Sequence, residues 1–136
     1  EACLAARRAR NPAACREADA AVAGARQLLA KADDEGALAA VEAAERACPE
    51  PTAEYYVVNA EALVRLKRWN DAVMRFHEAL RLAPANAEAA NGLAGVFYLS
   101  RRYEQARAVL RNAEAAGATV DAELKRAVEE KLAKPR

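Results

Sequence analysis

Apolar residues recur along this chain at intervals of three and four, the spacing that places them on one face of an α-helix. The clearest stretch, 53–86, predicts two amphipathic helices joined by a polar turn around Lys67 and Arg68 and closed by Pro84. The stretch 87–120 repeats this pattern, so the chain contains an internal helix–turn–helix repeat of 34 residues. The matching positions are Ala60 and Ala94, Leu63 and Phe97, Trp69 and Tyr103, Ala72 and Ala106, Phe76 and Leu110, and Ala79 and Ala113.

A weaker copy of the pattern precedes these two, over residues 18–52. The offset to the next copy is 35 residues, which indicates one inserted residue near 49–52. Asp34 stands where the later copies carry Trp69 and Tyr103, so we expect this first copy to be less well packed. Its matching positions are Ala25, Leu28, Ala37, Leu38, Val41, Ala44 and Pro49, against Ala60, Leu63, Ala72, Val73, Phe76, Ala79 and Pro84.

The two ends of the chain read as caps. Residues 1–17 are predicted to form an N-terminal cap segment. It contains a short helix that ends before Asn11-Pro12, because the residue before proline avoids the helical conformation. A cap over the first repeat is the leading interpretation, and a basic docking segment for acidic surfaces is the alternative. Residues 121–136 carry one apolar helical face and predict a closing helix. The expected organisation is a single domain, 1–136, with repeats at 18–52, 53–86 and 87–120 between the two caps.

The 34-residue period, the small residues and the aromatic residue after each turn resemble the tetratricopeptide repeat family. The resemblance covers about residues 18–134 and is most specific for 53–120. It implies an all-α fold, a right-handed α-α superhelix of antiparallel helix pairs, with about three repeats and a C-terminal capping helix. Helices pack closely over the repeated alanines, and Trp69 and Tyr103 are expected to be core wedges at the hairpin turns.

Composition narrows the function. A net charge of +1 gives no electrostatic case for nucleic acid, and no apolar run is long enough to cross a membrane. The only histidine, His77, has no partner for a metal site or a catalytic triad, and we interpret it as a surface residue. Because phosphate-binding and CxxC motifs are also absent, we expect neither enzymatic activity nor a cofactor. The alanine- and arginine-rich composition indicates a bacterial protein.

Cys3, Cys15 and Cys48 all lie in the first third of the chain, either as thiols or with two of them in a disulfide. If the first repeat folds as in the resembling family, Cys15 and Cys48 lie at adjacent ends of two antiparallel helices. A bridge between them is one hypothesis, and Cys3–Cys48 is its main rival. A disulfide would indicate an oxidising compartment such as the bacterial periplasm or cell envelope, and free thiols the cytoplasm.

The resemblance further implies that the first helix of each pair lines a concave surface. We expect an apolar centre at Val57, Val58, Tyr98 and Leu99, room over Gly92 and Gly95, and a contribution from Lys125 and Glu129. Val57 and Glu61 stand where a carboxylate-binding clamp of this family needs Lys and Asn, so that clamp is absent. The predicted peptide-binding residues are Arg26, Val57, Glu61, Val64, Arg65, Asn91, Gly95 and Tyr98.

These observations predict a protein–protein interaction module, or scaffold, that binds a peptide or protein segment in its groove, with Arg65 and Tyr98 orienting it. The alternative function is an extracytoplasmic regulatory or sensory segment of a larger protein such as a kinase. The expected partner is another protein, with no nucleic acid and no membrane insertion by this chain. Packing of the same face on another part of the protein, or self-association with a second copy, is the competing interpretation of the groove.

Overall fold

The computed structural model describes residues 11–134, and every regular element within this range is a helix. Residues 1–10, which include Cys3 and most of the expected N-terminal cap, lie outside the described residues. The helices, in chain order, are α2 (Pro12–Ala30), α3 (Asp34–Ala47), α4 (Ala53–Arg65), α5 (Trp69–Leu82), α6 (Ala87–Leu99), α7 (Tyr103–Ala115) and α8 (Ala122–Ala133).

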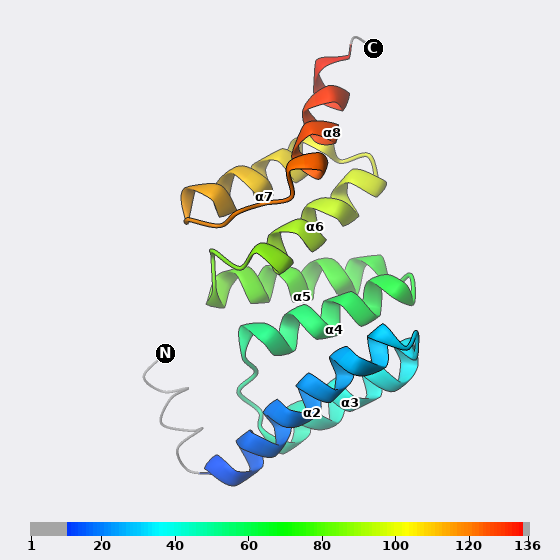
Figure 1. Cartoon of the computed structure of the whole chain (residues 1–136), viewed down its shortest axis with the longest axis vertical. Helices are drawn as coiled ribbons and strands as arrows, with labels where there is room; N and C mark the ends of the chain where they lie inside the picture. The colour runs from blue at the N-terminus through cyan, green and yellow to red at the C-terminus, as the bar shows by residue number, and fades with distance from the viewer. Residues whose placement is uncertain (1–10, 135–136) are drawn as a thin grey trace.

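Consecutive helices pair as antiparallel hairpins, α2 with α3, α4 with α5 and α6 with α7, and the pairs stack along the long axis of the molecule (Figure 1). The first helices of successive pairs, α2, α4 and α6, touch one another in order, and α8 continues the row by packing on α6 and α7. The second helices α3 and α5 make no direct contact. The chain is therefore an all-α, right-handed superhelix of antiparallel pairs, as the repeat pattern predicts.

One boundary differs from the expectation. The first helix begins at Pro12 and not at residue 18, so residues 12–17 belong to the first hairpin and not to a cap. Proline is well suited to this position because the first turn of a helix needs no backbone N–H donor. Asn11 caps the helix, with its side-chain oxygen accepting a hydrogen bond from the Ala14 N–H at 3.3 Å. The Asn11-Pro12 pair thus starts a helix here.

The three hairpins share one turn. Ala32, Lys67 and Arg101 follow the first helix of each pair and have φ angles of 61°, 61° and 63°. The recurrence of this left-handed residue at intervals of 35 and 34 positions matches the period of the sequence pattern. The α3–α4 connection, residues 48–52, is one residue longer than the α5–α6 connection, residues 83–86, which agrees with the change of offset.

The repeated alanines are buried where the helices approach most closely. Ala60, Ala72, Ala79, Ala94 and Ala106 are 0% exposed, and Ala113 is 2% exposed. A larger side chain at such a contact would force the helices apart, at a cost of about 1–3 kcal/mol. Most of the larger buried side chains fall into two clusters, one over α2, α3 and α4 and the other over α4 to α8.

The interpretation of Trp69 as a core wedge is wrong. Trp69 is the first residue of α5 and is 41% exposed, because the end of the hairpin lies at the protein surface. Tyr103, at the same place on α7, is half-buried and makes an edge contact with Tyr98, with ring centroids 5.5 Å apart. Phe76 and the alanines therefore fill the centre of the repeats.

Candidate functional site

The concave row of first helices is tied together by Arg26 on α2. Its Nε donates to Glu54 Oε1 on α4 at 3.0 Å, and its Nη1 and Nη2 donate to the two carboxylate oxygens of Glu88 on α6 at 2.9 and 3.3 Å. The hydrogen bond to Glu88 holds the pKa of Arg26 above its ordinary value. One guanidinium therefore spans the first helices of three successive repeats.

Glu61 lies beside this bridge, half-buried on α4. Burial, and then the charge of Glu88, raises the pKa of Glu61 above its ordinary range, and Arg26 and Arg65 oppose this only in part. Three carboxylates, of Glu54, Glu61 and Glu88, thus gather around Arg26. The centre of the concave face carries excess negative charge.

Arg65 is held by contacts within the protein. Its Nη1 donates to the Leu29 carbonyl at the end of α2 at 2.9 Å and lies 3.5 Å from Asp34 Oδ1. That Asp34 oxygen is buried and has no aligned hydrogen bond, so the arginine is its neutralising partner. Arg65 therefore joins α4 to the first hairpin, with 47% of its side chain still exposed. Asp34, which replaces the aromatic residue of the later repeats, makes this contact possible.

Of the expected apolar centre of the groove, the part formed by the two valines is wrong. Val57 and Val58 are both 0% exposed, because the first helices pack directly on one another and bury them in the two core clusters. There is also no room over Gly92, where an added Cβ would lie 2.4 Å from Cζ of Phe76. Gly95 is open, with nothing within 4 Å of such an atom.

Apolar surface remains at the far end of the concave row, on α6 and α4. Leu99 is 71% exposed, and Tyr98 and Val64 are half-buried. These residues, with Gly95, form the part of the predicted groove that is open to a partner.

Three other residues assigned to the concave face serve the C-terminal helix instead. Asn91 accepts a hydrogen bond from the Asp121 N–H at 2.9 Å, which fixes the start of α8. Lys125 pairs with Glu114 on α7 at 2.8 Å, and Glu129 lies 3.9 Å from Arg107 on the same helix. The expectation that Lys125 and Glu129 line the groove is therefore wrong, because α8 turns them toward α7.

Cys15 and Cys48 form a disulfide in the structure, with Cα atoms 5.0 Å apart. Cys15 is in the first turn of α2 and Cys48 is the C-cap of α3, so the bridge closes the open end of the first hairpin. Both residues are buried, at 6% and 3% exposure.

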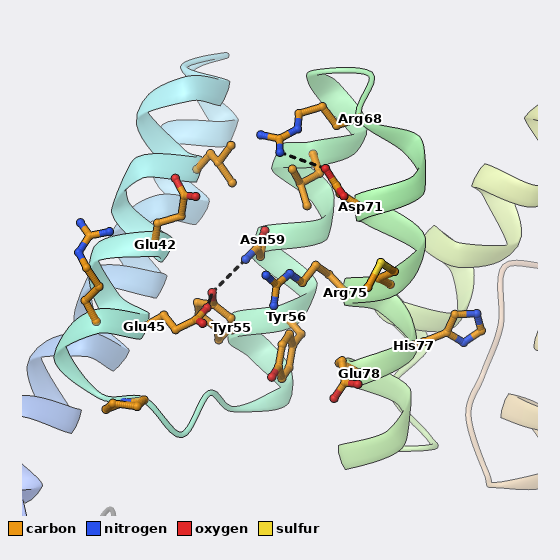
Figure 2. Close-up of a pocket in the computed structure, with 15 residues that line it drawn as sticks. Glu42, Glu45, Tyr55, Tyr56, Asn59, Arg68, Asp71, Arg75, His77 and Glu78 are labelled. Carbon is orange, nitrogen blue, oxygen red and sulfur yellow. Dashed lines mark hydrogen bonds and ion pairs between the residues drawn. The ribbon is translucent and has the colours of Figure 1, made fainter.

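A second surface, which the sequence reasoning missed, lies between the second helices α3 and α5 (Figure 2). It is a groove of about 1070 Å³ with α4 at its floor. We refer to it as the α3–α5 groove. It is lined by Leu38, Glu42, Glu45, Arg46, Pro49, Tyr55, Tyr56, Asn59, Leu63, Arg68, Asp71, Met74, Arg75, His77 and Glu78.

The floor of the α3–α5 groove is polar and ordered by hydrogen bonds. The Tyr55 hydroxyl donates to Glu45 on α3 and accepts from the Asn59 amide at 3.0 Å. Tyr55 and Asn59 are each only 3% exposed. Burial, and then the bond to Glu45, raises the pKa of Tyr55 well above its ordinary value. The signal in the sequence was Tyr55, Tyr56 and Asn59 at positions where the next repeat has Ala89, Ala90 and Leu93.

The ionic groups of this groove are largely paired. Arg68 binds Asp71 at 3.0 Å, and Glu78 pairs with Arg81 at 3.0 Å. The Arg75 guanidinium lies 5.8 Å from the centre of the Tyr56 ring. His77, at the α5 edge of the groove, is exposed, as the sequence predicted.

Between residues 11 and 134, no three His, Cys, Asp or Glu side chains are placed to hold a metal ion. Within the same range, no helix combines the length and the apolar character that a membrane span requires.

Comparison with known proteins gives two findings. A family model described as "Tetratricopeptide repeat" matches residues 60–130. Among solved structures, the crystal structure of the Sgt2 TPR domain from Aspergillus fumigatus is similar to this chain, with a TM-score of 0.73 and 18% sequence identity. That match covers 88% of this chain and 85% of the other. No curated protein matches the chain in sequence.

Proposed function

Because this chain belongs to the tetratricopeptide repeat family, a family of protein–protein interaction modules, we propose that it binds a positively charged segment of another protein along its concave face. The observation that supports this proposal is the group of three carboxylates, of Glu54, Glu61 and Glu88, around the guanidinium of Arg26, while the nearby Arg65 already pairs with Asp34. No enzymatic role is part of the proposal, in keeping with the family.

The chemistry favours a cationic ligand at this point. Glu61 is half-buried beside Glu88, so its ionised form has lost part of its hydration and faces a like charge. A lysine or arginine side chain from a partner would restore a favourable contact for both carboxylates. Arg26 does not supply that contact in full, because its guanidinium is already bonded to Glu54 and Glu88.

The open end of the same face supports an apolar contact by the same ligand. Glu88 and Leu99 lie 11 residues apart on α6, which corresponds to about 16 Å along a helix. An extended segment of about five residues covers that distance. A basic residue at the centre and an apolar residue over Tyr98 and Leu99 would therefore belong to one short segment.

The disulfide supports a particular cellular compartment for this function. Bridges of this kind persist in oxidising compartments, so Cys15–Cys48 agrees with the periplasm or cell envelope as the site of action. This location is part of the proposal.

The test is the affinity of the protein for a lysine- and alanine-rich peptide, with the same peptide carrying glutamate for every lysine as the ligand control. We expect the lysine peptide to bind and the glutamate peptide not to bind. Glu61→Gln should weaken the affinity for the lysine peptide about three- to tenfold, since charge pairs at an interface contribute on this scale. Glu130→Gln is the matched control, because Glu130 is exposed on α8 and carries the same charge. Equal affinity for both peptides, or an equal loss in both variants, would contradict the proposal.

A further inference from the structure

The α3–α5 groove differs from the corresponding place in the next repeat. There, between α5 and α7 and over α6, the hollow is about 300 Å³ and Leu93 lies at its floor. The first groove is about 1070 Å³, with Asn59 at the position of Leu93 and two tyrosines beside it. The architecture of the repeat therefore does not by itself produce a groove of this size and polarity.

The floor of this groove is held rigidly. Tyr55 is bonded at once to Glu45 on α3 and to Asn59 on α4, and the ring of Tyr56 makes an edge contact with that of Tyr55, with centroids 5.1 Å apart. A surface whose side chains are already ordered binds a partner with a smaller loss of conformational entropy.

The groove is lined by four carboxylates and three guanidiniums, and the guanidinium that reaches its centre is that of Arg75. Three of these carboxylates have partners within the protein: Glu45 with Tyr55, Asp71 with Arg68, and Glu78 with Arg81. Glu42 is exposed on α3.

Arg75 is half-buried and reaches from α5 toward Tyr56 and Asn59 (Figure 2). Its guanidinium lies over the Tyr56 ring, 5.8 Å from the ring centre, and takes part in no ion pair with a carboxylate of residues 11–134. A guanidinium oriented by an aromatic ring is suited to bidentate binding of a carboxylate.

An apolar side chain stands next to this arginine. Met74 is 66% exposed on α5 and lines the same groove, although methionine is usually buried. Leu38 and Leu63 lie deeper, at 9% and 3% exposure. Methionine adapts its shape to different ligands and is common on binding surfaces.

We propose that the α3–α5 groove is a second docking site, which binds an acidic segment of a partner protein through a carboxylate on Arg75 and a neighbouring apolar side chain against Met74. The groove lies on the opposite side of α4 from the carboxylates around Arg26. The site therefore selects the opposite charge from the concave face and is independent of it.

The experiment measures binding of a glutamate- and leucine-rich peptide to the full chain, with the same peptide carrying lysine for every glutamate as the ligand control. We expect Arg75→Gln to weaken the glutamate peptide about five- to tenfold, because one charge-assisted bidentate contact is lost. Arg126→Gln is the matched control: it removes the same charge, and Arg126 is exposed on α8 and does not line the groove. Met74→Gln should also weaken the peptide, by about threefold.

Circular dichroism of each variant checks that the fold is retained. Met74→Gln tests the site without changing its charge.

Equal weakening by Arg75→Gln and Arg126→Gln would reduce the effect to net charge and overturn the proposal. No binding of the glutamate peptide, or equal binding of the lysine peptide to this groove, would also overturn it. If Arg75→Gln loses binding of the glutamate peptide but still binds the lysine peptide, the two peptides occupy different sites, as proposed.

Discussion

The ring of Phe76 on α5 fills the space in front of Gly92 on α6, where an added Cβ would lie 2.4 Å from Cζ of the ring. Phe76 is 1% exposed and is among the largest fully buried side chains of the protein. Glycine at 92 is what allows an aromatic ring of this size to be buried between two successive hairpins. The concave face is closed at this point for the same reason.

Gly92→Ala should destabilise the protein by about 1–3 kcal/mol, because the methyl group overpacks the contact with Phe76. Gly95→Ala is the matched control on the same helix, since nothing lies within 4 Å of its Cβ position. There the gain in helix propensity should stabilise the protein by about 0.5–1 kcal/mol. Urea unfolding of the two variants measures the difference, and two changes of the same sign would contradict this account of the contact.

Loss of the Cys15–Cys48 bridge should lower the free energy of unfolding by about 3–4 kcal/mol, the entropy of closing a loop of this length. The two cysteines are 33 residues apart. The measurement is urea unfolding of the oxidised protein, of the reduced protein and of the Cys15→Ala, Cys48→Ala double variant.

Thiol labelling under native conditions is the companion measurement. With three cysteines in the chain, we expect one labelled thiol per molecule. The variant Cys3→Ser should then show none and keep the stability of the parent. Three labelled thiols in the parent would contradict the bridge, and a bridge that survives Cys15→Ala would support the rival pairing.

Arg65→Ala should destabilise the protein by about 1–3 kcal/mol, because it leaves the buried Asp34 oxygen without a partner and uncaps the Leu29 carbonyl. The double variant with Asp34→Ala should cost less than the sum of the two single variants, by about 1 kcal/mol. A double-mutant cycle in urea provides the test. Strict additivity would show that the two side chains do not interact.

Glu61→Gln should stabilise the free protein at neutral pH by up to about 1 kcal/mol, the scale of charge interactions on a partly exposed surface. Since the folded-state pKa of Glu61 is raised, folding favours its protonated form. That advantage is complete below the ordinary glutamate pKa and is lost as the pH rises through the folded-state pKa.

The melting temperatures of Glu61→Gln and the parent should therefore converge as the pH falls, and differ most at neutral pH. The same variant weakens the lysine peptide, so one substitution should raise stability and lower affinity. If Glu61→Gln is less stable than the parent at neutral pH, the ionised Glu61 carboxylate is not in an unfavourable environment, and this account is contradicted.

The fold was predictable because small side chains recur at fixed positions of the repeat, where only a close helix–helix contact accommodates them. Alanine at 60, 72 and 79, and again 34 residues later, specifies where helices touch. The polar turn at Lys67 and Arg68 and the amphipathic last helix were equally clear. The start of the first helix was misplaced because Asn11-Pro12 is compatible with both the end and the start of a helix.

The binding surface was less predictable, for a physical reason. Helical spacing assigns a residue to a face, but it does not say how closely the neighbouring helix packs on that face. Val57 and Val58 fell on the correct side of α4 and were buried by α2 and α6. Arg65 was assigned to a ligand, although its partners, Leu29 and Asp34, lie more than 30 positions away in the chain. The α3–α5 groove depends on the distance between two helices that do not touch. A repeat pattern in the sequence does not predict that distance.

The most direct test of the central proposal is an NMR titration of the labelled protein with the lysine- and alanine-rich peptide. We predict that backbone amide shifts will concentrate on the first helices, around Arg26, Glu61 and Glu88, and extend toward Leu99. The amides of Glu42 and Arg75, in the α3–α5 groove, should remain unchanged. Shifts confined to α3 and α5, or no saturable shifts on α2, α4 and α6, would contradict the assignment of the concave face as the site for a basic segment.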